Sequence, residues 1–164
     1  FRLGLGKVFY YDGTNALSFL KGFRYTNGLY LDKDSKQLYV ASMIGKNIQS
    51  FEIIESDVEL EAKFKKIFNL NFFPDNLTSS SKAPNHLLIG AHPRILSLQQ
   101  HSKNPQENLA PSVIKQLNLE TGDVRNIFSD DGQVVSGASS AVYYNQRLVI
   151  GNIFQMNLPV CDVE

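Results

Sequence analysis

Two groups of polar residues carry oxygen atoms at a spacing that repeats along the chain. Asn27 lies 11 residues before an apolar run that begins at Leu38, and Asn76 lies 11 residues before a similar run that begins at Leu87. Asp75 stands beside Asn76. One carboxylate and two amide carbonyls at equivalent strand starts suit a hard cation such as Ca²⁺, which takes about 6–8 oxygen ligands in a loose geometry. The spacing therefore predicts a calcium site built from these three residues.

Each of these residues also has a simpler interpretation. Asn27-Gly28 is a common turn dipeptide because both residues tolerate positive φ, and Asp75 could cap a loop. Asn76-Leu77-Thr78 is an acceptor sequence for N-linked glycosylation, which would make the protein a glycoprotein. A buried metal ligand cannot carry a glycan, so the two interpretations of Asn76 exclude each other, and the repeated spacing favours the ligand.

The elements that must position these residues are short strands that recur along the chain. Three runs contain three large apolar residues followed by small ones, at residues 38–42, 87–91 and 148–152, and they begin 49 and 61 residues apart. A repeat of about 40–50 residues is typical of four-stranded propeller blades, and closed propellers have about 4–8 blades. The sequence therefore predicts an all-β partial β-propeller of about three blades, as one domain fragment over residues 1–164.

Other segments extend this prediction. Leu60, Ala62 and Phe64 alternate with polar residues, which predicts a strand rather than a helix. Residues 99–111 are rich in Gln, Asn and Pro and fill the longer interval, so they are interpreted as an inserted loop. In the third repeat the 11-residue spacing falls on Gly137, which offers no side-chain ligand. His86 and His101 are flanked by polar residues and are predicted to face solvent.

Composition limits the possible functions. The chain has 164 residues with 16 Lys+Arg and 16 Asp+Glu, so its formal net charge is zero. Nucleic-acid-binding domains usually carry a basic excess, so no nucleic-acid partner is expected. A hydrophobic content of 43% with 20% charged residues is typical of a packed domain and not of a disordered chain. The single cysteine, Cys161, excludes an internal disulfide framework and a cysteine-rich zinc site.

Four motifs resemble those of one known family. They are GFRYTNG at residues 22–28, DNLT at 75–78, IGAHP at 89–93 and LVIGNIF at 148–154, and Cys161 follows them. In this order and spacing the chain resembles the C-terminal half of the paraoxonase/arylesterase family, six-bladed β-propeller hydrolases with calcium in a central tunnel. The resemblance implies that the ligands of the catalytic Ca²⁺ include Asn27, Asp75 and Asn76. It also implies a substrate pocket lined by Tyr25, His92, Ser139 and Ile153.

The resemblance also implies what lies outside the chain. The N-terminal half of the family supplies further calcium ligands and the histidine pair that is usually assigned the general-base role, so no residue here is a certain catalytic base. Cys161 resembles the cysteine that joins the first and last strands of the ring, which makes it one half of a disulfide. The missing N-terminal half is therefore an expected partner.

The leading hypothesis is a calcium-dependent hydrolase of aryl esters or lactones, with the chain alone inactive. A small-molecule ester or lactone is the expected substrate. The resemblance implies an extracellular or secretory-pathway location and leaves open an association with a lipid or membrane surface. Two alternatives remain: a non-enzymatic paraoxonase-like accessory or chaperone protein, and a gluconolactonase-like lactonase, against which the C-terminal Cys161 argues.

Overall fold

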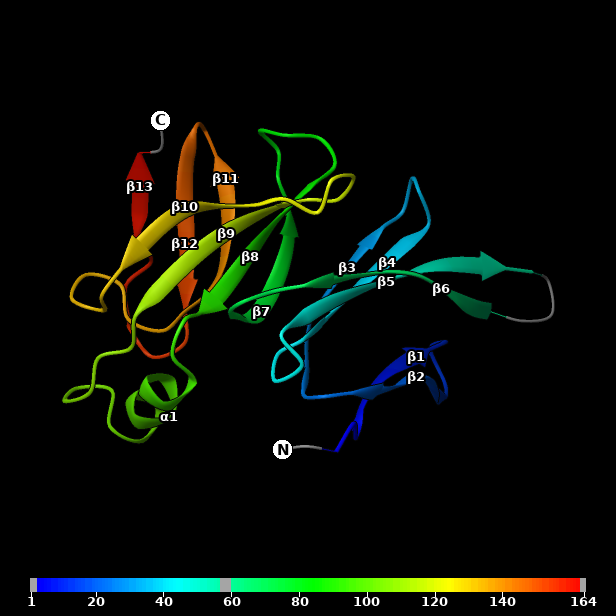
Figure 1. Cartoon of the computed structure of the whole chain (residues 1–164), viewed down its shortest axis with the longest axis horizontal. Helices are drawn as coiled ribbons and strands as arrows, with labels where there is room; N and C mark the ends of the chain where they lie inside the picture. The colour runs from blue at the N-terminus through cyan, green and yellow to red at the C-terminus, as the bar shows by residue number, and fades with distance from the viewer. Residues whose placement is uncertain (1–2, 57–59, 163–164) are drawn as a thin grey trace. The chain divides into compact units, whose positions relative to one another are not determined.

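A computed structural model describes residues 3–56 and 60–162 (Figure 1). The chain divides into two compact units, Phe1–Asn71 and Phe72–Glu164. Every strand pairing in both units is antiparallel. In the described residues, no helix is long and apolar enough to span a membrane.

The first unit contains a four-stranded sheet and a two-stranded hairpin. The sheet has the order β3-β4-β5-β6, and the hairpin pairs β1 with β2. The strands are β1 (Gly6–Tyr11), β2 (Ala16–Phe23), β3 (Thr26–Asp32), β4 (Gln37–Ser42), β5 (Asn47–Glu55) and β6 (Leu60–Asn69). Within each of these two sheets, every strand pairs with the next along the chain, as strands joined by hairpin connections do.

One apolar cluster joins the hairpin to the sheet of the first unit. Val8 and Phe23 of the hairpin pack with Leu38, Val40 and Phe51 of the sheet. The ring of Phe23 meets that of Phe51 edge to face, with centroids 6.1 Å apart. Edge-to-face aromatic pairs add to the stabilisation that burial provides, so this contact anchors the hairpin.

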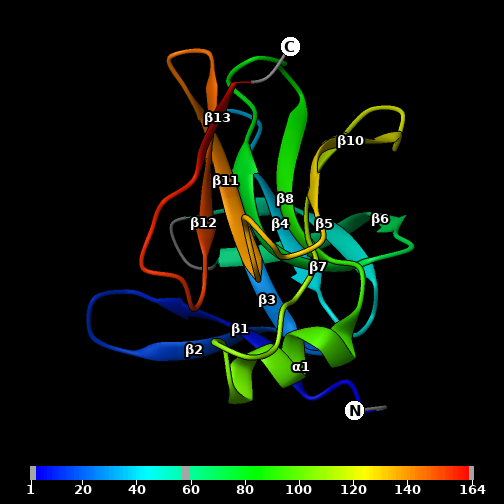
Figure 2. The same cartoon turned by 90° about the vertical axis from the view of Figure 1, so that its left-hand side faces the viewer.

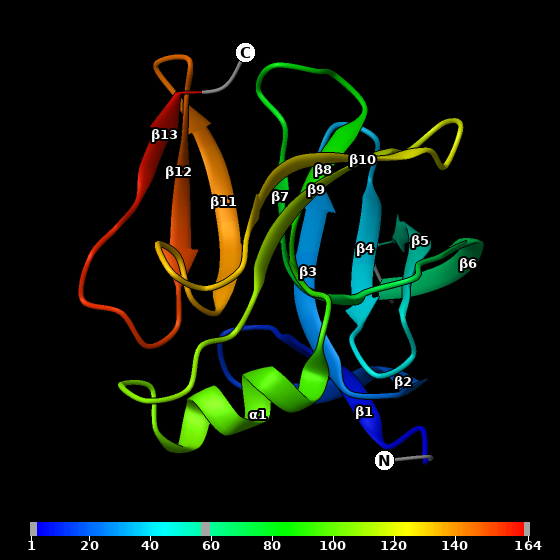
Figure 3. The same ribbon diagram turned by 60° about the vertical axis from the view of Figure 1, so that its left-hand side comes forward.

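The second unit contains a four-stranded sheet, a three-stranded sheet and one helix. The sheets have the orders β7-β8-β9-β10 and β11-β12-β13. The elements are β7 (Phe73–Ser79), β8 (His86–His92), α1 (Ile95–Lys103), β9 (Ser112–Asn118), β10 (Val124–Asp130), β11 (Ala138–Tyr144), β12 (Arg147–Asn152) and β13 (Val160–Asp162). Figure 2 and Figure 3 show the two sheets side by side, with α1 beyond the ends of the strands β8 and β9 that it connects.

The core of the second unit lies between its two sheets. Leu88 and Ile114 from the four-stranded sheet pack with Ala141, Leu148 and Ile150 from the other, and all are buried. The near-continuous apolar run of β8 is typical of a strand that is covered on both faces. The hydroxyl of Thr78 also donates a hydrogen bond to the carbonyl of Ala141 at 2.5 Å, which fixes β7 against β11.

The predicted strand repeat is confirmed. The three apolar runs form β4, β8 and β12, and each is the second strand of its sheet. The two complete sheets have four strands, the third has three, and none closes into a barrel, as expected for part of an all-β propeller. Leu60 opens strand β6, so the alternation of Leu60, Ala62 and Phe64 was interpreted correctly.

Two predictions for the segment between β8 and β9 are wrong. The segment contains α1, Ile95–Lys103, and is not simply a loop. His101 faces the interior with 1% of its surface exposed, because its Nδ1 donates to the carbonyl of Asn108 at 2.5 Å and its ring packs against Phe154. The polar neighbours of His101 face solvent, but one helical side can be buried while the others are exposed.

Candidate active site

The first strand of each four-stranded sheet carries a β-bulge near its beginning. In β3, Asn27 and Gly28 stand opposite the single residue Ala41. In β7, Asp75 and Asn76 stand opposite Gly90. A bulge interrupts the alternation of side chains and turns them in new directions, and bulges are common beside active sites. The residues proposed as metal ligands therefore lie where the strand geometry is irregular.

A third bulge changes how the repeats must be aligned. The register of β11 shifts between Ala138 and Ser140 and leaves Ser139 as the extra residue. The strand pairing thus makes Asn27 equivalent to Asp75 and to Ser139. The sequence spacing had matched Asn27 with Asn76 and Gly137, and this match is wrong. The turns between the first and second strands contain four, six and two residues in the three sheets, so a fixed spacing cannot keep the register.

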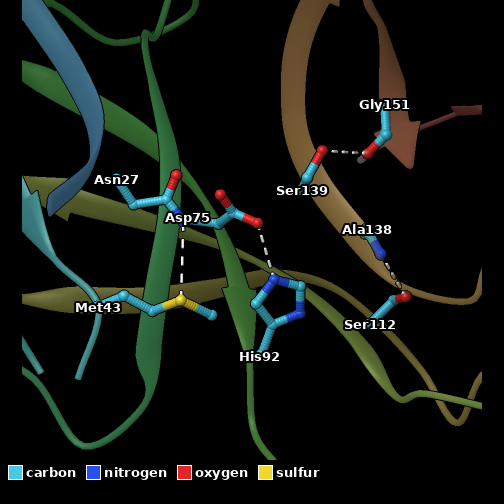
Figure 4. A network of polar contacts seen from close by, with 8 residues as sticks. All are labelled: Asn27, Met43, Asp75, His92, Ser112, Ala138, Ser139 and Gly151. Atoms are coloured by element: carbon cyan, nitrogen blue, oxygen red, sulfur yellow. Dashed lines mark hydrogen bonds and ion pairs between the residues drawn. The ribbon is translucent and has the colours of Figure 1, made fainter. Parts of the chain in front are cut away.

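Asp75 and His92 form a buried pair in the second unit. Oδ2 of Asp75 lies 2.8 Å from Nε2 of His92, and the two side chains are only 7% and 1% exposed. Figure 4 shows this contact between the bulge of β7 and the end of β8. The sequence placed Asp75 on the metal and His92 on the pocket wall as separate functions, whereas the structure joins them.

The chemistry of this contact fixes the proton on His92. A carboxylate only accepts hydrogen bonds, so Nε2 carries the hydrogen that it donates to Asp75. Nδ1 of His92 is buried and has no hydrogen-bond partner among the described residues. In the same part of the chain, the carboxylate of Asp75 makes no second hydrogen bond. The pair therefore presents one carboxylate oxygen and one ring nitrogen that are available to a further group.

The other second-unit residues proposed for the site lie on or beside strands of the two sheets. Asn76 follows Asp75 in β7 and is exposed, which is compatible with either a ligand or a glycan. Ser139 lies in β11, and its hydroxyl is 3.5 Å from the carbonyl oxygen of Gly151. Ile153 follows β12 and is 47% exposed, so its side chain is available to line a surface.

Two proposed residues belong to the first unit. The side-chain amide of Asn27 donates to the sulfur of Met43 at 3.6 Å (Figure 4), and its carbonyl oxygen has no hydrogen-bond partner among the residues that the structure describes. Tyr25 is 56% exposed and has a φ of 63°, an unusual value for a bulky residue. This backbone turn directs the Tyr25 ring outward just before β3 begins.

The oxygen donors of these residues fit a calcium ion better than a soft metal. In the second unit, Asp75 offers one carboxylate oxygen and the amide of Asn76 a neutral one; in the first unit, the amide of Asn27 also carries a neutral oxygen. No group of three or more His, Cys, Asp or Glu side chains gathers within the described ranges. Ca²⁺ accepts amide oxygens and backbone carbonyls beside a carboxylate, so oxygen donors of these types suit it, and the carboxylate of Asp75 is the charged one among them.

The remaining chemistry-bearing residues lie away from the Asp75–His92 pair. Cys161 lies in β13 opposite Leu148 and packs against the second-unit core. Burial raises the pKa of its thiol, with a further contribution from Asp162 and then Asp130. As the one cysteine of the chain it cannot form an internal disulfide, and its pairing with a cysteine elsewhere stays a prediction. Nδ1 of His86 contacts the carbonyl oxygen of Pro84 at 2.7 Å in an exposed setting.

Comparison with known proteins gives consistent matches over nearly the whole chain. A family model described as "Arylesterase" matches residues 1–163. Human "Serum paraoxonase/lactonase 3" is 29% identical over 153 residues, which cover 92% of this chain and 42% of the relative. Dog "Serum paraoxonase/arylesterase 2" is 26% identical over 151 residues, with the same two coverages. The chain thus spans about two-fifths of the length of these relatives.

A further curated relative and one solved structure extend these matches. Mouse "Serum paraoxonase/lactonase 3" is 29% identical over 158 residues, which cover 95% of this chain and 43% of the relative. A "Luciferin-regenerating enzyme" of known structure overlaps 86% of this chain and 59% of its own, with 7% identity and a TM-score of 0.37. That overlap is too weak to bear on the fold.

Proposed function

Because the chain belongs to the arylesterase family, we propose that it contributes part of the active site of a calcium-dependent hydrolase of aryl esters or lactones. The observation that carries this proposal is the buried contact between Asp75 and His92. A carboxylate kept from solvent and held by one hydrogen bond is oriented before any ligand arrives, and such preorganisation is what catalytic sites require.

The residues of this chain have separate roles in the proposal. In the second unit, Asp75 and Asn76 would hold the ion, and Asp75 dominates its retention because a carboxylate attracts a divalent cation more strongly than an amide dipole does; Asn27 stays a candidate ligand on the first unit. When bound, Ca²⁺ would polarise the ester carbonyl and stabilise the oxyanion that forms. His92 holds Asp75 in place through Nε2–H, as outer partners of metal ligands commonly do.

Substrate contacts would come from exposed and half-exposed residues of each unit. In the second unit Ile153 offers apolar surface and Ser139 offers a hydroxyl at the bulge equivalent to that of Asp75, and in the first unit Tyr25 offers an exposed ring. An aryl group or lactone ring matches such a wall because it combines an apolar face with one polar carbonyl. In this proposal, the general base comes from a partner segment, since the chain resembles only the C-terminal half of the family.

Calcium binding to the 164-residue chain tests the metal part of the proposal. Calorimetric titration of the parent is expected to show Ca²⁺ binding that Asp75→Asn removes. Asp34→Asn is the matched control, because Asp34 is exposed on a turn of the first unit and should bind as the parent does. Equal Ca²⁺ binding by the parent and Asp75→Asn would show that Asp75 is not a ligand.

Hydrolysis tests the enzymatic part. The chain alone should not hydrolyse phenyl acetate, because it holds one charged ligand and no assigned base. Joined to the N-terminal portion of human paraoxonase/lactonase 3 in place of the matching region, it should hydrolyse phenyl acetate or a δ-lactone with Ca²⁺ and not with a chelator. A folded chimera that binds Ca²⁺ through Asp75 without hydrolysis would favour the accessory-protein alternative, and hydrolysis restricted to sugar lactones would favour the gluconolactonase-like one.

The proposal extends, through the same family, to the cellular location of the protein and to its remaining partners. A paraoxonase-like protein is expected in the secretory pathway or outside the cell, with a lipid or membrane surface as a further candidate partner. If Asn76 holds the ion, expression in secretory cells should yield a chain without a glycan at Asn76. A shift in mass after enzymatic deglycosylation, lost in Asn76→Gln, would contradict its role as a ligand.

A further inference from the structure

A second concave site lies in the second unit, away from Asp75 and His92. It is bounded by α1 with the segment that follows it, by the loop before β11 and by the loop between β12 and β13, and its volume is about 510 Å³. Figure 3 shows α1 and the β12–β13 loop at the same end of this unit. Cavities of about 300–1,000 Å³ commonly hold small molecules, so the size permits a ligand.

Two carboxylates hold the loop that forms one wall, and one of them, Oδ1 of Asp131, accepts a hydrogen bond from the backbone N–H of Gln133 at 3.1 Å. Oδ1 of Asp130 accepts hydrogen bonds from the backbone N–H groups of Gly132, Val134 and Val135 at 2.8–3.1 Å. Gln133 lies in the middle of this loop and is exposed. Because the Asp130 carboxylate holds the backbone on both sides of Gln133, the Gln133 side chain extends from a backbone segment whose conformation is fixed.

The other walls are fixed in the same way. Asn152 accepts a hydrogen bond from the backbone N–H of Gln155 at 2.7 Å and donates one to the carbonyl of Asn157 at 2.9 Å. Ser136 accepts one from the N–H of Ala110 at 2.8 Å, and His101 joins α1 to Asn108. A site whose walls are already held loses little conformational freedom when a ligand binds.

The lining has an unusual chemical composition. Four of its side chains are carboxamides, namely Gln106, Gln133, Gln155 and Asn157. No Asp, Glu, Lys or Arg is among the lining residues, and the apolar part comes from Pro105, Leu109, Phe154 and Met156. Within the described residues, the amides of Gln106, Gln133 and Asn157 make no hydrogen bond, whereas Gln155 is used to hold Ser136 and Val134.

We propose that this pocket binds an uncharged ring compound that carries hydroxyl groups on its edge and an apolar face, which is the chemistry of a neutral sugar. A carboxamide both donates and accepts, and so pairs with hydroxyl groups that do the same. The exposed side chains of Met156 and Leu109 provide the surface for the apolar face. A charged ligand is disfavoured, because no opposite charge lines the pocket to replace its hydration.

Saturation-transfer NMR on the complete 164-residue chain tests this proposal. The probes are methyl glycosides of glucose, galactose and mannose, with glucuronate as a charged comparison and cyclohexanol as an apolar one. At least one methyl glycoside should bind, with a Kd of about 1 mM, and should bind at least about threefold more tightly than either comparison. Gln133→Ala and Asn157→Ala should each weaken binding about three- to tenfold, as expected for a lost hydrogen bond.

The control variant is Gln99→Ala, which removes an exposed carboxamide of α1 outside the pocket and should bind as the parent does. Both pocket variants change exposed side chains, so they should keep the fold of the parent. The proposal is overturned if no methyl glycoside binds, if cyclohexanol binds as tightly as the glycosides, or if Gln133→Ala and Asn157→Ala bind like Gln99→Ala. None of these outcomes depends on calcium or hydrolysis.

Discussion

Gly90 lies directly against the backbone of Ser139, so that a Cβ atom added at Gly90 would overlap the Ser139 carbonyl oxygen. Gly90 belongs to β8 and Ser139 to the bulge of β11, and the two strands pack within the second unit. The absence of a side chain at Gly90 therefore sets the distance between the two sheets. It also brings the bulge of β11 close to the strand opposite Asp75 and Asn76.

Gly90→Ala is expected to destabilise the chain by about 3 kcal/mol or more, because the added methyl meets backbone that cannot rotate away. Chemical denaturation monitored by circular dichroism measures this change. Val142→Ala is the control, since Val142 is 46% exposed on β11 and should cost less than about 1 kcal/mol. An unchanged denaturation midpoint for Gly90→Ala would mean that the two sheets do not approach as described.

His92→Ala is expected to weaken Ca²⁺ binding about tenfold, although His92 is not itself a proposed ligand. The reason is that His92 orients the Asp75 carboxylate, and loss of such outer partners typically lowers metal affinity by about 10–100-fold. Calorimetry on His92→Ala and Asp75→Ala should place His92→Ala between the parent and Asp75→Ala. His86→Ala is the control, because that histidine is outside the pair. Parent-like affinity in His92→Ala would restore the view that His92 only lines the pocket.

Breaking the Asp75–His92 pair should also destabilise the fold without calcium. Loss of one partner from a buried hydrogen bond typically costs about 1–3 kcal/mol, and more where the group left unpaired is charged, as the Asp75 carboxylate is in His92→Ala. Denaturation in chelator should show this loss for Asp75→Ala and for His92→Ala. The double variant should lose less than the sum of the two, since the residues share one interaction. Strictly additive losses would indicate that the contact contributes nothing to stability.

Cys161 is expected to react slowly with thiol reagents at pH 8. The thiol is half-buried, and burial together with Asp162 and Asp130 raises its pKa above the ordinary value of 9.0, so little reactive thiolate is present. Because the folded-state pKa is raised, the corresponding stability is full at lower pH and is lost as the pH rises through that pKa. A disulfide-exchange assay should show complete labelling, slower than that of glutathione and accelerated by denaturant. Labelling of the folded chain at the rate of glutathione would contradict this.

Asp32 should stabilise the β3–β4 turn only above its titration range. Its carboxylate accepts the hydroxyl of Ser35 at 2.6 Å and the backbone N–H of Asp34 at 3.1 Å. The Ser35 hydroxyl is the main cause of a pKa below the ordinary 3.8. This contribution is present above pH 3.8 and is lost as the pH falls through the lowered pKa. Asp32→Ala should cost less than about 1 kcal/mol at pH 7, because the group is largely exposed to solvent, and less at pH 2 than at pH 7, whereas Asp34→Ala should be neutral at both.

The sequence by itself determined the strand repeat and the family. The apolar runs at residues 38–42, 87–91 and 148–152 form the second strand of each sheet. In β4 and β8 nearly every residue is buried, so the run is apolar on both faces, whereas in β12 Leu148 and Ile150 are the buried residues. The motifs around Asn27, Asp75 and His92 led to the family that the comparison shows. These features depend on neighbouring residues in the sequence, so a local pattern of residue types is sufficient to predict them.

Only the tertiary structure decided which residues meet. The contact between Asp75 and His92 joins residues 17 positions apart. Its geometry depends on the β-bulge in β7, which cannot be predicted from the residue types alone. The positions of the bulges also show that Asp75 and Ser139 are the equivalents of Asn27, in place of Asn76 and Gly137. The number of residues between the bulge and the next strand varies with the length of the turn, so equal spacing along the chain does not identify equivalent positions. The burial of His101 likewise depended on Asn108 and Phe154. Such relations arise from strand pairing and packing between segments, and the order of residues along the chain does not contain them directly.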